Sequence, residues 1–276
     1  MKKRIYVLLI GLVLALSGCA TAQEVQPFTV QGDHGKLSAV LSTPKGKKTY
    51  PLVMIVHGFN GSKNLPLMVE VNKQIQARGI ATVIFDFNGH GDSEGSFLDM
   101  TIPNEIEDAR RVYEYVSKLP QVESVSMVGH SQGGVVTAML AGQLGADKVK
   151  SIVLMAPAGE LKDDTAKGDL FGTKYDPKNV PEYITLYTGL KVGRAFLETT
   201  PHQPIYETAA KYTGPVLIVH SVDDELVPYV YGERFRPGYK NVQMITLHDY
   251  DHSFTQDQAA VGKMVADYFA EQLLKK

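Results

Sequence analysis

The segment Gly129-His130-Ser131-Gln132-Gly133 places a serine midway between two glycines. A strand-like run, 124–128, precedes it, and a helical pattern, 135–144, follows it. A sharp turn between a strand and a helix exposes a serine hydroxyl, and small residues on either side let the backbone pass closely. The positive end of the helix dipole then lies beneath that hydroxyl. The context therefore predicts Ser131 as a nucleophile, although glycines flank serines in many ordinary turns of this kind.

A serine hydroxyl needs a base at neutral pH, and the base needs an acid that orients it. In hydrolases with this turn, the acid and then the histidine follow the serine along the chain. His252 lies late in the polar loop after the last predicted strand, where the base belongs. We therefore predict His252 as the base. The other histidines after Ser131 are His202, His220 and His248, and His220 is expected to bond to the backbone.

The acid is expected just after the strand predicted at 215–220, where three carboxylates stand side by side. We favour Asp224, with Asp223 as the alternative, and we expect the other two carboxylates of the three to be solvated.

The loop that holds His252 also permits a metal site, because His248, Asp249 and Asp251 stand at short spacing from it. Neither an H-E-x-x-H pattern nor a third cluster of ligands accompanies them. We therefore predict no metal and no cofactor.

An oxyanion hole needs two backbone N–H donors. The residue after the nucleophile, Gln132, supplies one, and the turn after the first buried parallel strand supplies the other. That strand, 51–56, runs into His57-Gly58-Phe59, so the second predicted donor is the Phe59 N–H. His57 is expected to fix this loop, and His90 lies in a second polar, glycine-rich loop whose expected role is turn geometry.

The elements that must position these residues alternate between strand-like and helix-like segments. Continuous apolar runs at 51–56 and 81–85 are typical of parallel strands covered on both faces. We therefore predict the α/β class over residues 28–276, with a mostly parallel, doubly wound sheet and helices on both faces. The segment 159–213 interrupts the alternation for 55 residues, and we predict that it is an inserted lid.

The composition excludes several other classes. The chain has 276 residues, 44% hydrophobic and 21% charged, so it is neither disordered nor fibrous. Its formal net charge is −2 although Lys2-Lys3-Arg4 opens the chain, so the remainder is mildly acidic. A nucleic-acid partner is therefore not expected. Cys19 is the single cysteine, which excludes an intrachain disulfide.

The first 18 residues predict an export signal, because Lys2-Lys3-Arg4 precedes an apolar run of 13 residues, Ile5–Ser17. A spanning helix needs about 20 apolar residues. The sequence Leu-Ser-Gly-Cys that ends at Cys19 resembles a bacterial lipobox. We predict a signal peptide at 1–18, lipidation of Cys19 and a flexible tether over 19–27. The protein would then be an exported, membrane-anchored lipoprotein, sorted to the outer membrane in a Gram-negative host because Ala20 follows the cysteine.

The region 28–276 resembles the α/β-hydrolase superfamily, and segments of it resemble the bacterial cinnamoyl and feruloyl esterases. These segments are HGFNGSK (57–63), FDFNGHGDSEG (85–95), VGHSQGGVV (128–136), LMAPAGELKDD (154–164), PIYETAAKYTGPVLIVH (204–220) and the run at 224–228. The resemblance implies a triad of Ser131, Asp224 and His252, with Asp224 as the acid because it stands four residues after His220.

The same resemblance implies that the lid, 159–213, shapes the substrate pocket. Esterases of this family use lid polar groups to bind the phenolic hydroxyl of ferulate or caffeate, and Asp164 matches the lid aspartate in that role. Phe171 and Phe196 stand where hydroxyl or amide side chains would help, and we expect them to pack against the substrate.

We predict a serine carboxylesterase for aryl esters of the cinnamoyl or feruloyl type, including feruloyl esters of plant polysaccharide, or for short acyl esters. One alternative is a monoacylglycerol-type lipase. Another is a proline-iminopeptidase-like peptidase, whose lid would use Asp163, Asp164 or Asp169 to bind a free amino terminus. The last alternative is a non-catalytic binding module on the same scaffold, but such proteins usually lack a member of the triad.

Overall fold

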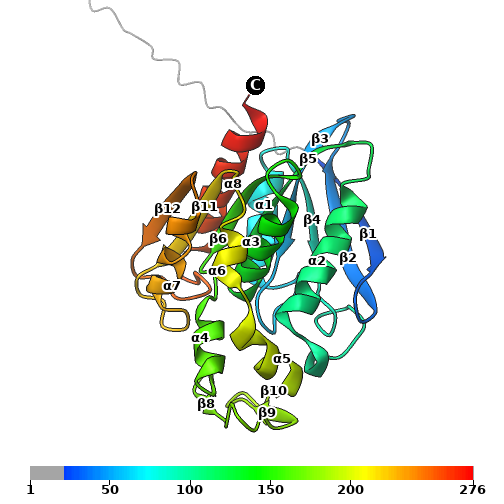
Figure 1. The fold of residues 1–276 in the computed structure, drawn as a ribbon. Coiled ribbons are helices and arrows are strands. Elements are labelled where there is room, and N and C mark those ends of the chain that lie inside the picture. The colour runs from blue at the N-terminus through cyan, green and yellow to red at the C-terminus, as the bar shows by residue number, and fades with distance from the viewer. Residues whose placement is uncertain (1–21, 276) are drawn as a thin grey trace, which may run out of the picture.

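The computed structural model describes residues 22–275, and its centre is an eight-stranded sheet (Figure 1). The strand order is β1-β2-β4-β3-β5-β6-β11-β12, and the six strands from β4 to β12 run parallel to one another. β1 and β2 are antiparallel additions at one edge. The bounds of the strands are β1 Gln23–Gln31, β2 Lys36–Pro44, β3 Tyr50–Val56, β4 Ala81–Phe85, β5 Val122–His130, β6 Val149–Met155, β11 Val216–Ser221 and β12 Val242–Leu247.

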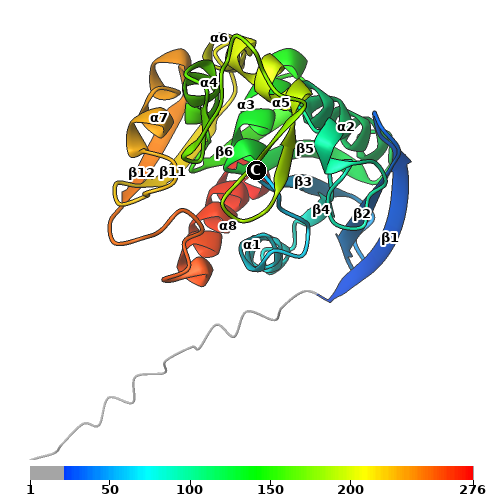
Figure 2. The ribbon, with the colours of Figure 1, turned by 90° about the horizontal axis from the view of Figure 1, so that it is seen from below.

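Helices cover both faces of this sheet, as Figure 2 shows. One face packs against α1 and α8, and the other packs against α2, α3 and α6. β3 and β4 are buried along their whole length because each lies between these two layers. The predicted doubly wound sheet is therefore confirmed. The bounds are α1 Pro66–Gln76, α2 Ile102–Val116, α3 Gln132–Leu144, α6 Ile205–Ala209, α7 Tyr229–Glu233 and α8 Gln258–Leu274, with short 3-10 helices η1 Phe97–Asp99 and η3 Arg236–Gly238.

The predicted lid segment lies between β6 and β11 and consists of short helices and hairpins at one end of the sheet (Figure 1). Its last helix, α6, belongs to the main helical layer, because it packs closely on α3. The other elements are α4 Glu160–Ala166, β7 Asp169–Leu170, β8 Thr173–Lys174, β9 Tyr183–Thr185, β10 Lys191–Gly193, α5 Arg194–Thr199 and η2 Thr200–His202.

The start of the folded region differs from the prediction. Residues 23–27, expected in the flexible tether, belong to β1, which pairs with β2 from Gln23 opposite Pro44 onwards. This part of β1 is polar and mostly exposed, so its sequence carries no burial pattern. The predicted signal peptide and Cys19 lie outside the residues that the structure describes. Within residues 22–275, no helix is both long and apolar enough to cross a membrane.

Candidate active site

Ser131 stands at the sharp turn from β5 into α3, with φ 57° and ψ −127°. A serine rarely adopts a positive φ, and such strain persists only where the surrounding structure imposes it. The turn is tight because a Cβ on Gly133 would lie 2.2 Å from the His57 carbonyl oxygen. The side chain of Ser131 is thereby held at the end of β5 where the parallel strands terminate.

His252 and Asp224 are joined by a hydrogen bond of 2.8 Å from His252 Nδ1 to Asp224 Oδ2. The other ring nitrogen of His252, Nε2, makes no hydrogen bond with any residue of the described chain. Ser131 and His252 line the same pocket. The structure therefore brings together the three residues that the sequence predicts as nucleophile, acid and base.

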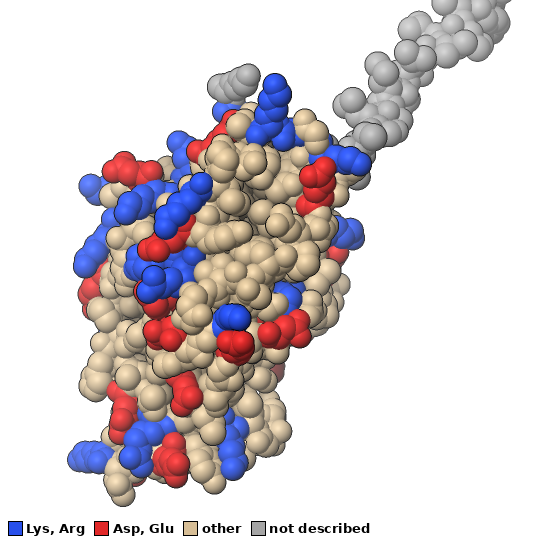
Figure 3. Space-filling view, turned by 90° about the vertical axis from the view of Figure 1, so that its right-hand side faces the viewer, with Lys and Arg blue, Asp and Glu red and all other residues tan. Residues whose placement is uncertain are grey.

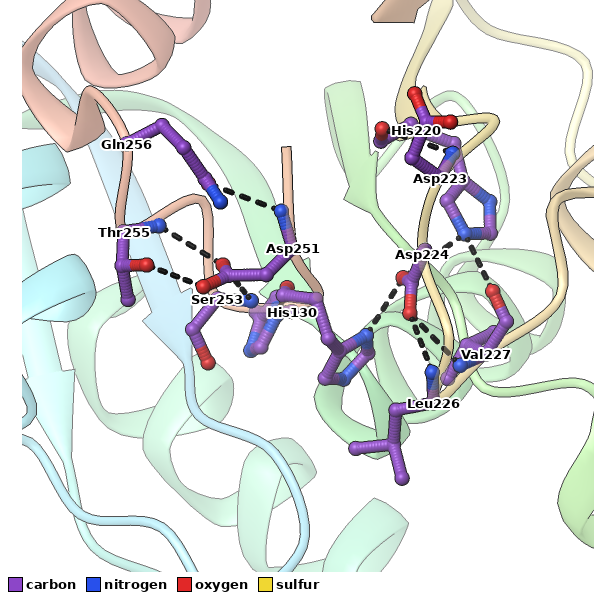
Figure 4. Close-up of polar contacts among 12 residues, drawn as sticks. His130, His220, Asp223, Asp224, Leu226, Val227, Asp251, Ser253, Thr255 and Gln256 are labelled. Carbon is purple, nitrogen blue, oxygen red and sulfur yellow. Dashed lines mark hydrogen bonds and ion pairs between the residues drawn. The ribbon is translucent and has the colours of Figure 1, made fainter. Parts of the chain in front are cut away.

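Asp224 is held by more than the predicted base, as Figure 4 shows. Its Oδ1 accepts hydrogen bonds from the N–H groups of Leu226 and Val227, at 3.0 and 2.8 Å. His220 Nε2 lies 3.2 Å from Oδ2 and 3.0 Å from the Val227 carbonyl oxygen. Burial would raise the pKa of Asp224, but the hydrogen bonds from His220 and His252 hold it well below its usual range. The carboxylate is therefore ionised and fixed in direction.

His130 and Asp251, neither of which the sequence predicts in this role, hold the loop of His252. His130 Nε2 donates to the His252 carbonyl oxygen at 2.8 Å, and burial lowers the pKa of His130 to about 3, so its ring is neutral. The Asp251 carboxylate accepts from the N–H groups of Ser253 and Thr255. The Asp-x-Ser-x-Thr spacing is a local turn signal that identifies Asp251. Nothing in the sequence indicates the contact of His130, which spans 122 positions.

The loop after β3 approaches Ser131 closely, since a Cβ on Gly58 would lie 2.8 Å from Ser131 Cβ. No group in residues 22–275 accepts a hydrogen bond from the Phe59 N–H. Gln132 is the first residue of α3, so its N–H has no acceptor within the helix. Both N–H groups predicted for the oxyanion hole thus belong to backbone beside Ser131.

A buried ion pair fixes this loop to the end of β4. Lys63 Nζ lies 2.5 Å from Asp86 Oδ2, and the Lys63 N–H donates to Asp86 Oδ1 at 2.6 Å. Asp86 is fully buried, whereas the second partner of Lys63, Asp92, is exposed. His57 accepts the Phe87 N–H at 3.2 Å, and burial lowers the pKa of His57 to about 3. The neutral ring therefore ties the same two loops together, in the fixing role predicted for it.

The pocket that contains Ser131 and His252 has a volume of about 250 Å³. Phe59 and Phe171 line it with their rings packed edge to face at 5.1 Å, and Phe196 lies fully buried behind Phe59 at 5.7 Å. Leu186 and Leu190, from the turn between β9 and β10, also line it. The interior beside the serine is thus mostly apolar.

The structure does not bring Asp164 into this pocket. Asp164 lies on α4, and its carboxylate pairs at 3.2 Å with Lys167, the residue that directly follows this helix. Phe171 reaches the pocket because the backbone reverses after β7, where Phe171 has a φ of 49°. Of the three predicted substrate-binding residues, Phe171 alone lines the pocket.

The alternative metal site at 248–252 is not assembled. The carboxylate oxygens of Asp251 bond to Ser253 and Thr255 in its own loop, and Asp249 contributes its N–H to Asp223. In the described part of the chain, no group of three or more His, Cys, Asp or Glu side chains is placed to hold a metal ion.

Two family profiles match most of the chain between them: the serine aminopeptidase (S33) profile over residues 47–173 and the TAP-like protein profile over residues 190–276. Among solved structures, Est1E from Butyrivibrio proteoclasticus with bound ferulic acid is 32% identical, with a TM-score of 0.85. The match covers 89% of this chain and 98% of that one. An esterase from Pyrococcus furiosus, 21% identical with a TM-score of 0.70, covering 92% of each chain, shares the fold.

Curated relatives are more distant. The lysophosphatidylserine lipase ABHD12 of Danio rerio is 25% identical over 80% of this chain and 59% of its own length. The mitochondrial palmitoyl-protein thioesterase ABHD10 of Mus musculus is 23% identical over 67% of this chain and 62% of its own. The chain thus spans less than two thirds of the length of these relatives.

The strained serine turn, the sheet and these matches are those of a serine hydrolase. The chain belongs to the α/β-hydrolase superfamily.

Proposed function

We propose that Ser131, His252 and Asp224 form a catalytic triad that hydrolyses aryl esters of the cinnamoyl or feruloyl type, or short acyl esters. The observation that carries the proposal is the hydrogen bond from His252 Nδ1 to the ionised Asp224, which leaves Nε2 free in the pocket of Ser131. With Nδ1 protonated, Nε2 is the basic atom, and it can accept the hydroxyl proton of Ser131.

In the first half of the reaction, Ser131 Oγ attacks the ester carbonyl while His252 Nε2 takes its proton. The N–H groups of Phe59 and Gln132 stabilise the negative oxygen that develops. The alcohol leaves with the proton from His252, and the acyl group stays on Ser131. In the second half, water attacks the acyl-enzyme, and His252 again takes a proton and returns it to Ser131.

The pocket supports an apolar acyl group. Its volume of about 250 Å³ and its edge-to-face pair of Phe59 and Phe171 suit a flat ring or a short chain. Est1E, the esterase with bound ferulic acid, resembles this chain over almost its whole length. We therefore place the acyl group of the ester against the lid. A cinnamoyl group is the largest acyl group that we expect this pocket to hold.

A monoacyl lipid ester is a second candidate, because apolar side chains are exposed at the mouth of the pocket. Leu65, Leu226 and Tyr187 line it and are 39%, 47% and 86% exposed. The relatives named as lysophosphatidylserine lipases are consistent with such a substrate.

The peptidase alternative is supported by the description of the serine aminopeptidase profile over residues 47–173, but not by the lid. The three lid carboxylates that could bind an amino terminus are paired with cations of the chain itself: Asp163 with Arg234, Asp164 with Lys167 and Asp169 with Lys174.

We further propose that Cys19 carries a lipid anchor on an exported bacterial protein. Only residues 20–22 then separate the anchor from β1. Gln23 lies opposite Pro44, and β2 places that end of the hairpin beside the beginning of β4. Ser131 lies where the parallel strands end. The pocket would therefore open on the side of the sheet away from the bilayer.

A substrate panel tests the proposed function: p-nitrophenyl esters from acetate to laurate, methyl ferulate, methyl cinnamate and an aminoacyl arylamide. Hydrolysis of short acyl or cinnamoyl esters, abolished in Ser131→Ala, supports the proposal. A clear preference for laurate would favour the lipid ester, and cleavage of the arylamide alone would overturn the assignment.

A further inference from the structure

Gln132 and Glu105 form a buried side-chain pair behind the backbone of the active-site serine. Gln132 Nε2 donates to Glu105 Oε2 at 2.6 Å and lies 3.4 Å from Met100 Sδ. Gln132 is fully buried and Glu105 is 1% exposed. The bond joins the first turn of α2 to the first residue of α3.

Each partner leaves one buried oxygen without a hydrogen-bond donor in the described chain, namely Glu105 Oε1 and Gln132 Oε1. An ionised Glu105 would offer only acceptors, and two unpaired buried acceptors are costly. A protonated Glu105 carries one donor. A planar carboxylic acid and a planar amide can then pair through two hydrogen bonds, each supplying one donor and one acceptor.

We propose that Glu105 is a positioning residue that is protonated at neutral pH and donates from Oε1 to Gln132 Oε1, so that a ring of two hydrogen bonds fixes the Gln132 N–H. The inference rests on the proposed function, in which that N–H is one of the two oxyanion donors. A donor that is already aimed stabilises developing charge without reorganisation. Glu105 acts through Gln132 and touches no substrate.

The electrostatic surroundings agree with the geometry. Burial raises the pKa of Glu105 to about 8, opposed by the hydrogen bond from Gln132 and assisted by Asp108, one turn along α2. From α3, Glu105 faces the neutral amide of Gln132, whose Nε2 also lies 3.4 Å from the uncharged sulfur of Met100 in the loop before α2. As pH rises through this pKa, Glu105 loses its only donor, the second bond is lost, and kcat should fall.

The kinetic test compares Glu105→Gln with Glu105→Ala, with Glu107→Gln on the same helix as the matched control. A glutamine can form both hydrogen bonds without titrating. Glu105→Gln should keep kcat within about twofold at neutral pH and lose the alkaline fall, while Glu105→Ala should lower kcat about tenfold or more with little change in KM. If Glu105→Gln behaves like Glu105→Ala, or keeps the alkaline fall, the proposal is wrong.

A spectroscopic test detects the protonated carboxyl group directly and does not depend on enzyme activity. Infrared difference spectra of the wild type between neutral and alkaline pH should contain a C=O stretch of a buried carboxylic acid that is absent from Glu105→Gln. Any band from the buried Glu160, whose pKa is also raised by burial, should remain in that variant. Circular dichroism identifies a variant that does not fold. If no ester is hydrolysed but the band is present, the proposed function fails while the protonated pair stands. Absence of the band from the wild type at neutral pH overturns the inference.

Discussion

Asp224 and Asp223 are neighbours in the chain, yet their carboxylates have different hydrogen-bond partners. Asp224 is buried and accepts from His252, Leu226 and Val227, whereas Asp223 accepts from the N–H of Asp249. The sequence predicts Asp224 as the acid through its match to the family pattern, with Asp223 as the alternative. Spacing alone cannot tell which of two adjacent carboxylates turns inward, because that depends on the turn after β11.

Replacing each aspartate by asparagine tests this difference. Asp224→Asn should lower kcat by about 10⁴-fold, because an amide cannot stabilise the imidazolium and favours the wrong ring tautomer. Asp223→Asn keeps an oxygen for the Asp249 N–H, so we expect a change of at most a few-fold. Steady-state kinetics on one ester measures both variants. The reverse ranking would show that the acid is Asp223.

The parallel part of the sheet could be predicted at the element scale because its strands are buried on both faces. β3 and β4 are continuous apolar runs of the expected kind. β1 escaped prediction over 23–27 because an exposed edge strand needs no apolar pattern. The short elements of the lid could not be predicted from the sequence either, because β7 and β8 have only two residues each and depend on tertiary contacts. The pair of Glu105 and Gln132 joins two helices across 27 positions, which no local spacing reveals.

The loop that contains Phe59 depends on the buried ion pair between Lys63 and Asp86. Asp86→Asn removes the buried charge that pairs with Lys63. We therefore expect the free energy of unfolding to fall by about 2 kcal/mol or more, with a lower Tm. kcat should also fall, because the loop that contains Phe59 is less firmly held. Asp92→Asn is the control, since it removes the exposed partner of the same lysine. Equal loss of Tm in both variants would contradict the role given to Asp86.

Phe171, from the lid, lines the pocket beside Phe59. Phe171→Ala removes a ring that lines the pocket, so kcat/KM should fall more for methyl cinnamate than for p-nitrophenyl acetate, by about tenfold. Asp164→Ala, outside the pocket, is the control and should leave the preference between ferulate and cinnamate unchanged. A selective loss on ferulate would restore Asp164 as the residue that binds the phenolic hydroxyl.

At the scale of the whole molecule, the two ends of the parallel strands have separate tasks. The hairpin of β1 and β2 places Gln23 at the end of the sheet where the parallel strands begin, and the lid elements lie at the opposite end (Figure 1). Ser131 and residues of the lid line the pocket at that opposite end. Acidic and basic side chains are mixed over the face shown in Figure 3, with no field of one sign. An anchor at the N-terminus would therefore hold the protein without blocking the pocket.

The anchor proposal predicts that Cys19→Ser releases the protein from the membrane fraction, because lipidation requires the thiol. Turnover of a water-soluble ester by the released enzyme should match that of the wild type, because the pocket lies at the end of the parallel strands that is farther from Gln23. Fractionation and kinetics on the same preparations measure both effects. Continued sedimentation of Cys19→Ser with membranes would show that something other than an acyl chain on Cys19 retains it.

Covalent labelling can show whether Ser131 is the nucleophile. An alkyl phosphonate with a good leaving group should react with the wild type in a one-to-one ratio. Mass spectrometry of the digest should locate the adduct on Ser131. Ser131→Ala should remain folded by circular dichroism, take up no label and lose ester hydrolysis by about 10⁴-fold or more. An adduct on another residue, together with ester hydrolysis retained in Ser131→Ala, would show that Ser131 is not the nucleophile.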